Sequence, residues 1–197
     1  YSDLEQQAWE IAHVDLIEQD LLDKPRDIVI VHMYLAPDEN PAEVLPLFEQ
    51  SGLPLVVELK AERGNHDALA AATCAMLDKY KVLYCIESFD PRCIRWLKRN
   101  RPEIVRGQLS ENFLRHGDGG DMPKALLWAL GNLLTNCLAK PDFIAYRFSD
   151  RDNFCLRWCR WFYHVQEINW TIITKEEMRA AESAGNLVIF QDFDPRL

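Results

Sequence analysis

Short runs of apolar residues alternate with amphipathic segments along most of the chain. Runs rich in β-branched and aromatic residues predict strands, and apolar positions that recur every three or four residues predict helices. The predicted strands are residues 15–22, 28–31, 52–60, 82–86, 104–109, 141–146, 168–173 and 187–190, and the predicted helices are residues 4–12, 41–48, 66–79, 91–96, 123–138, 150–163 and 174–184. This alternation is typical of an α/β fold, in which helices cover a parallel sheet.

Two of the predicted helices begin with specific signals. Asp90 is a good N-cap, and Pro91 suits the first helical position because its missing N–H would have no partner there. Thr174 and Glu177 have the spacing of a capping box, and Gly185 can end the helix that follows. These signals place both helix starts within the predicted alternation.

Charged and polar residues gather where several predicted strands end. They are Glu18 and Asp20, Glu58 and Lys60, Glu87, and Trp170-Thr171. An open doubly wound sheet would carry a Gly-rich phosphate turn after an early strand, and the sequence contains none. Functional residues at the carboxyl ends of several strands are instead typical of a TIM (β/α)₈ barrel. Because the repeating series has seven strands besides residues 28–31, we expect one barrel domain over residues 1–197, lacking its first β-strand and its native start.

Composition and charge narrow the possible partners. The chain has 197 residues, of which 48% are hydrophobic, enough for one sizeable core. Its net charge of -9 argues against a nucleic-acid partner, and no apolar run approaches the length of a membrane helix. The six cysteines form no CxxC motif, and Cys155 and Cys159 lie one helical turn apart. We interpret them as packed thiols in a reducing, cytoplasmic compartment.

The charges at the strand ends suggest a metal site. Residues two apart on a strand share a face, so Glu18 lies with Asp20 and Glu58 lies with Lys60. Three carboxylates at one rim repel unless a cation lies among them, and hard oxygen ligands select Mg²⁺ or Ca²⁺. His32 ends a strand and can serve as general acid or base. The simpler interpretation is a Glu58–Lys60 ion pair, solvated carboxylates and a strand-end histidine.

Seven motifs, in order, resemble those of glycerophosphodiester phosphodiesterases. They are Ile17-Glu18-Gln19-Asp20, Val31-His32-Met33, Glu58-Leu59-Lys60, Glu87-Ser88-Phe89, Arg106-Gly107-Gln108-Leu109, Trp170-Thr171 and Ile189-Phe190. The match is strongest from Leu53 to Phe190 and looser from Tyr1 to His32.

The resemblance implies a TIM-barrel enzyme that hydrolyses glycerophosphodiesters to glycerol 3-phosphate and an alcohol. It implies that Glu18, Asp20 and Glu58 bind the divalent metal, with His32 as one of two catalytic histidines. It further implies that Lys60 holds the phosphate, and that Phe89 and Trp170 line the pocket for this small-molecule substrate.

The sequence departs from the family at several positions. It contains no His-Arg-Gly motif, where the family has its first histidine, and Met33 replaces the Asp that usually follows the second. Two other functions therefore stay open. One is a degenerate barrel that binds a metal or phosphodiester without turnover. The other is a glycosidase using Glu58 and Glu87, which Lys60 disfavours because it would lower an acid's pKa. Since a missing strand exposes sheet edges, we also expect marginal stability or a homodimer.

Overall fold

A computed structural model of the chain describes residues 31–32, 45–46, 48–50, 52, 54–62, 64–117 and 119–191, with residues 31–32 described by their backbone only. The chain divides into two compact units, residues 1–106 and residues 107–197. The predicted helix 4–12 and strand 15–22 lie outside the described residues, as does all of the predicted strand 28–31 except Val31. Each unit is described by itself below.

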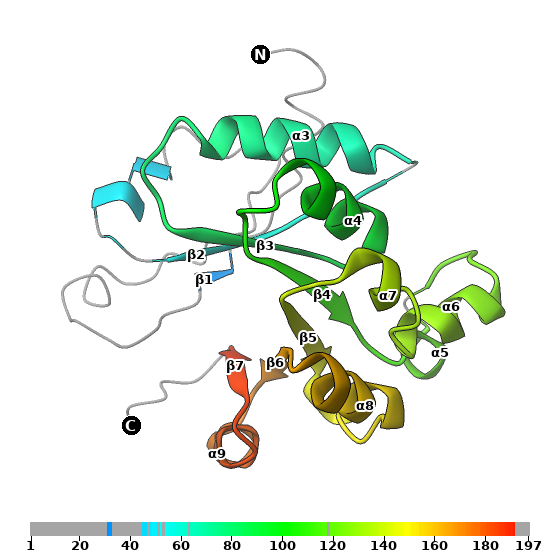
Figure 1. Cartoon of the computed structure of the whole chain (residues 1–197). Helices are drawn as coiled ribbons and strands as arrows, with labels where there is room; N and C mark the ends of the chain where they lie inside the picture. The colour runs from blue at the N-terminus through cyan, green and yellow to red at the C-terminus, as the bar shows by residue number, and fades with distance from the viewer. Residues whose placement is uncertain are drawn as a thin grey trace. The chain divides into compact units, whose positions relative to one another are not determined.

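The first unit contains a parallel ladder of three strands whose order follows the chain. The strands are β1 (Val31–His32), β2 (Leu55–Glu58) and β3 (Tyr84–Ser88). Val31 pairs with Leu55, and Leu55 pairs in turn with Tyr84 (Figure 1). The helices α3 (His66–Leu77) and α4 (Pro91–Asn100) follow β2 and β3 along the chain. This is the predicted order of strand and helix.

Helix α4 begins as its sequence predicts. The Oδ1 of Asp90 accepts a hydrogen bond from the backbone N–H of Arg92 at 2.9 Å, and Pro91 occupies the first helical position. Ile94 and Leu97 are fully buried, which fixes the face that packs inward. The helix extends past the predicted end at Trp96, because Leu97 continues the buried apolar stripe into the last turn.

The second unit continues the parallel arrangement. Its strands are β4 (Arg106–Ser110), β5 (Phe143–Arg147), β6 (Gln166–Ile172) and β7 (Leu187–Phe190). Its helices are α5 (Phe113–His116), α6 (Lys124–Gly131), α7 (Asn136–Ala139), the 3₁₀ turn η2 (Phe148–Asp150), α8 (Phe154–Tyr163) and α9 (Lys175–Ser183). All paired neighbours are parallel, and Leu109 pairs with Ala145, which pairs with Ile168.

Gly107 allows β4 and β5 to approach closely. It pairs with Phe143 across the ladder, and a Cβ atom added at Gly107 would overlap the Phe143 ring. The glycine of the Arg-Gly-Gln-Leu motif therefore leaves the space that the aromatic ring fills, and Phe143 is consequently buried.

The single helix predicted over residues 123–138 is wrong. The structure has α6 and α7 separated by a turn in which Leu133 adopts a φ of 59°. Leu133 is buried with Ile144 and Leu156 in a cluster that also contains Tyr146 and Cys159. The break thus places the Leu133 side chain in the core. Its burial offsets the free-energy cost of its left-handed backbone conformation.

The helix predicted over residues 150–163 begins later than predicted. Asp150 belongs to η2, and the N-cap of α8 is Asn153, whose Oδ1 accepts from the N–H groups of Cys155 and Leu156 at 2.8 and 3.2 Å. The N-cap at Thr174 is confirmed, because its Oγ1 accepts from the N–H of Glu177 at 3.2 Å. The side chain of Glu177 reaches back one residue further than in a capping box, and its Oε2 accepts from the N–H of Ile173 at 3.1 Å.

Both units are parallel α/β structures, as the sequence pattern predicts. This arrangement is consistent with part of a TIM barrel, whereas a closed eight-stranded barrel stays a prediction. Among the described residues, no helix has both the length and the apolar character needed to cross a membrane.

Candidate functional site

Two buried carboxylates lie at the carboxyl end of the first unit's ladder. Glu58 is the last residue of β2 and is 5% exposed, and its partner in the ladder, Glu87 of β3, is fully buried. Paired residues of a parallel ladder lie on the same face, so the two side chains leave the sheet together. Lys60 follows Glu58 by two residues and is partly buried. A positive charge beside two acids reduces the cost of burying them.

The Glu-Ser-Phe motif connects these two strand ends. The N–H of Leu59 donates to the carbonyl of Glu87 at 2.7 Å, and the hydroxyl of Ser88 donates back to the carbonyl of Leu59 at 2.6 Å. The same hydroxyl accepts from the N–H of Asp90 at 3.0 Å, which joins β3 to the start of α4. Phe89, the last residue of the motif, is partly buried. Ser88 thus fixes the strand ends that carry both glutamates.

The remaining predicted metal ligands are not placed by the structure. Glu18 and Asp20 lie outside the described residues. His32, the predicted catalytic histidine, is the last residue of β1, and the structure describes only its backbone. Within the part of the chain that the structure describes, no three His, Cys, Asp or Glu side chains meet as a metal site. The ligand set Glu18, Asp20 and Glu58 therefore stays a prediction.

Trp170, the predicted pocket residue of the second unit, lies beside a charged pair. It pairs with Arg147 across β5 and β6, and the guanidinium carbon of Arg147 is 5.8 Å from the centroid of its ring. Arg147 also donates from Nη1 to Oε2 of Glu111 at 2.6 Å, and Glu111 directly follows β4. The Arg147 cation lies over the indole ring and binds the buried Glu111 carboxylate. This end of the strand is therefore polar.

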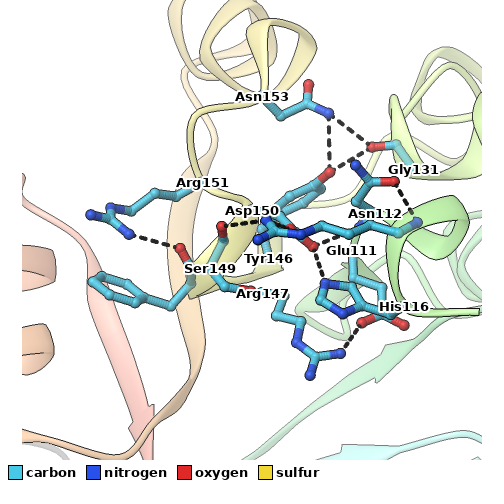
Figure 2. A network of polar contacts seen from close by, with 12 residues as sticks. Glu111, Asn112, His116, Gly131, Tyr146, Arg147, Ser149, Asp150, Arg151 and Asn153 are labelled. Carbon is cyan, nitrogen blue, oxygen red and sulfur yellow. Dashed lines mark hydrogen bonds and ion pairs between the residues drawn. The ribbon is translucent and has the colours of Figure 1, made fainter. Parts of the chain in front are cut away.

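A second polar network centres on Asp150 (Figure 2). Its Oδ2 accepts from the backbone N–H of Asn112 at 2.9 Å and contacts Nε2 of His116 at 2.8 Å. Its Oδ1 accepts from Nη1 of Arg115 at 3.0 Å. Burial pushes the pKa of Asp150 upward, but these three partners outweigh it and hold the pKa below the usual value for Asp. The carboxylate is therefore ionised. It links η2, which follows β5, to α5 and the residue before it, which follow β4.

These residues were not identified from the sequence. The ring of His116 is 18% exposed and bound to Asp150. A histidine held at one nitrogen by a carboxylate has a fixed orientation and can exchange a proton through the other nitrogen. The signal for Glu111 and Arg147 was present, because each stands at the carboxyl end of a strand, as Glu58 does.

Several of the cysteines are packed thiols, whereas Cys137 is exposed. Burial raises the pKa of Cys85 and of Cys93 to about 12 and that of Cys159 to about 11. Such thiols are protonated at neutral pH and are weak nucleophiles. All six cysteines are free thiols in the structure.

Comparison with known proteins identifies the fold. No protein-family model and no curated protein matches the chain. Among solved structures, a phosphodiesterase from Oleispira antarctica in complex with the product sn-glycerol 3-phosphate is similar, with 17% identity and a TM-score of 0.55. The aligned region covers 78% of this chain and 57% of the Oleispira antarctica chain. A protein assigned as a glycerophosphoryl diester phosphodiesterase from Silicibacter pomeroyi is 20% identical with a TM-score of 0.57, covering 84% and 55%.

A glycerophosphodiester phosphodiesterase from Parabacteroides distasonis is also similar, with 13% identity and a TM-score of 0.51, covering 74% of this chain and 57% of its own. The chain thus spans little more than half the length of these proteins. The similarity predicted from the seven motifs is confirmed at the level of the fold, and the chain has a fold like that of the glycerophosphodiester phosphodiesterases.

Proposed function

We propose that the chain hydrolyses glycerophosphodiesters to glycerol 3-phosphate and an alcohol, with a divalent metal ion. The fold of solved phosphodiesterases supports this reaction class. The observation that supports a specific site is the buried Glu58–Glu87 pair. These two residues are in register at the carboxyl ends of β2 and β3. In a parallel α/β sheet this end is where ligands bind.

The residues of this strand end fit a hard cation. Two adjacent buried carboxylates supply oxygen donors, the ligand type that Mg²⁺ and Ca²⁺ prefer. In the proposal, Glu18, Asp20 and Glu58 hold the ion. A bound divalent ion would polarise a phosphoryl oxygen as a Lewis acid.

The side chains of the proposed site have separate tasks. Lys60 binds the phosphate through its ammonium group, which offsets the negative charge of the phosphodiester. His32 transfers a proton as general acid or base. Phe89, which directly follows β3, provides an apolar wall beside the phosphate.

A second candidate is a barrel that binds a metal or phosphodiester without turnover. Two sequence observations favour it. No His-Arg-Gly motif occurs in these 197 residues, and Met33 stands where the family has an Asp beside its second histidine. Without an orienting carboxylate, His32 would be a less effective proton donor.

Hydrolysis of glycerophosphocholine with Mg²⁺ or Ca²⁺ separates the two candidates. The assay compares this chain with its Glu58→Gln variant. The control is Glu62→Gln, an exposed glutamate near the same strand end. Metal-dependent turnover that is lost in Glu58→Gln and kept in Glu62→Gln supports the phosphodiesterase. Metal binding without turnover supports the non-catalytic barrel.

A further inference from the structure

Helix α8 exposes five aromatic residues, and all of them except Tyr163 lie on the side opposite its core contacts. Leu156 and Cys159 are buried in the core. Phe154, Trp158, Trp161, Phe162 and Tyr163 are instead 72%, 43%, 73%, 54% and 40% exposed. The rings of Trp158 and Phe162 stack at 4.7 Å between centroids with an interplanar angle of 7°. A helix on a soluble surface normally carries polar residues at such positions, so this stripe requires an explanation.

The stripe continues onto the segment around α7. Leu134 and Cys137 line a depression of about 260 Å³ together with Phe154, Trp158 and Tyr163 of α8. Leu134 is 48% exposed and Leu138, in α7, is 58% exposed. We define the aromatic face as Phe154, Trp158, Trp161, Phe162, Tyr163, Leu134 and Leu138. It belongs entirely to the second unit, where α7 and α8 are drawn in yellow-green and yellow-orange in Figure 1.

The charge of these segments is opposite to that of the chain. The whole sequence has 31 acidic residues and a net charge of -9. Residues 122–141 and 153–166, which carry the aromatic face, contain no Asp or Glu. Their charged residues are Lys124, Lys140, Arg157 and Arg160, of which Arg160 is paired with Glu167 at 2.9 Å. An apolar face with basic residues beside it is complementary to an anionic surface.

We propose that the aromatic face binds a lipid bilayer that carries anionic headgroups. Trp, Tyr and Phe are the residues that favour the boundary between headgroups and acyl chains, because their rings have an apolar body and, in Trp and Tyr, a polar atom. Arg157 is exposed beside the rings and reaches the headgroup phosphates. The proposal does not depend on the hydrolytic function proposed above.

A second copy of the chain fits this face less well. Most homodimers are symmetric about a twofold axis, so the same patch would meet itself. Arg157 of one copy would then face the equivalent basic surface of the other, with no acidic residue in residues 153–166 to pair with it. A bilayer of anionic lipid supplies the missing negative charge without this repulsion.

Co-sedimentation with vesicles tests the proposal. The chain is mixed with vesicles of phosphatidylcholine alone or of phosphatidylcholine with phosphatidylglycerol, at low and high salt. We expect binding to the anionic vesicles, weakening as salt rises, with a blue shift of tryptophan fluorescence. The double variant Trp161→Ser/Phe162→Ser should lose about tenfold or more in affinity, since an interfacial helix binds through its buried apolar area. Leu83→Ser, which changes a residue 72% exposed in the first unit, is the matched control and should bind as the wild type does.

Arg157→Gln keeps the rings and removes one exposed charge, so it should weaken binding to the anionic vesicles only. This variant and the salt series test the proposal even if the double variant does not fold. The proposal is wrong if the chain does not bind anionic vesicles at low salt, or if the folded double variant binds them as tightly as the wild type does. It is also wrong if sedimentation shows a dimer that the double variant converts to a monomer.

Discussion

Glu58 and Glu87 are direct partners in the ladder of β2 and β3, with exposed fractions of 5% and 0%. Negative charge on two adjacent carboxylates is costly in a medium of low polarity. Lys60, a partly buried basic residue, follows Glu58 by two positions at the same strand end. A cation of higher charge would stabilise the pair further, which is the physical basis of the proposed metal site.

Binding of a divalent cation should stabilise the folded chain. At a concentration of Mg²⁺ or Ca²⁺ one hundred times its Kd, we expect the free energy of unfolding to rise by about 2.7 kcal/mol. Glu58→Gln should abolish this gain because it replaces a charged ligand by a neutral one. Urea unfolding with the metal and with a chelator measures the effect, and Glu62→Gln should behave as the wild type. An equal gain in Glu58→Gln would exclude Glu58 as a ligand.

Gly107 and Phe143 should depend on each other. A methyl group at position 107 would overlap the Phe143 ring, so Gly107→Ala should destabilise the chain by about 1–3 kcal/mol, the usual cost of overpacking. In a Phe143→Leu background the side chain at 143 is smaller, and adding Gly107→Ala should cost much less. Urea unfolding of the four proteins gives the coupling energy. Equal costs in both backgrounds would show that the strain lies elsewhere.

Local features of the fold could be predicted from the sequence. The start of α4 at Asp90-Pro91 and the N-cap of α9 at Thr174 need only residues a few positions apart, and both are confirmed. The strand that carries Glu58 was also predicted, over residues 52–60, and the structure has it over Leu55–Glu58. Such signals depend on short-range geometry, which the sequence contains directly.

Features that depend on distant residues could not be predicted. The break at Leu133 lets its side chain pack in a cluster with residues of β5 and α8, and this packing overrides a strong local preference for helix. In the Asp150 network, Asp150 binds Asn112 and His116, which precede it by 38 and 34 positions. Its members lie in and beside the short elements α5 and η2, where neither periodicity nor spacing indicates which side chains will meet.

Asp150 should make the stability of the chain depend on pH. Its pKa in the folded protein is below the value of about 3.9 expected in the unfolded chain. The ionised carboxylate therefore stabilises the folded state above that value, and the contribution is lost as the pH falls through the folded-state pKa. Asp150→Asn should cost about 1–3 kcal/mol at pH 7, because it weakens buried hydrogen bonds to charged partners.

Urea unfolding from pH 7 to pH 3 measures this contribution. The difference between wild type and Asp150→Asn should begin to shrink as the pH falls below about 4, since the unfolded chain then takes up a proton at Asp150 before the folded protein does. Asp152→Asn, at an exposed position two residues away, serves as the control and should change stability little. A difference that stays constant across the pH range would mean that shape, rather than charge, makes Asp150 necessary.

Asn153 should stabilise α8 through two different atoms. Its Oδ1 caps the helix by accepting from Cys155 and Leu156, while its Nδ2 donates to the hydroxyl of Tyr146 at 3.1 Å. Asn153→Ala removes both and should cost about 1–2 kcal/mol, the value of a lost N-cap. Asn153→Asp keeps an acceptor for the cap and should retain most of the stability, because a carboxylate is also favourable at a helix N-terminus. Urea unfolding compares the two variants. If Asn153→Asp is as unstable as Asn153→Ala, the bond to Tyr146 contributes more than the cap, because only Asn can donate it.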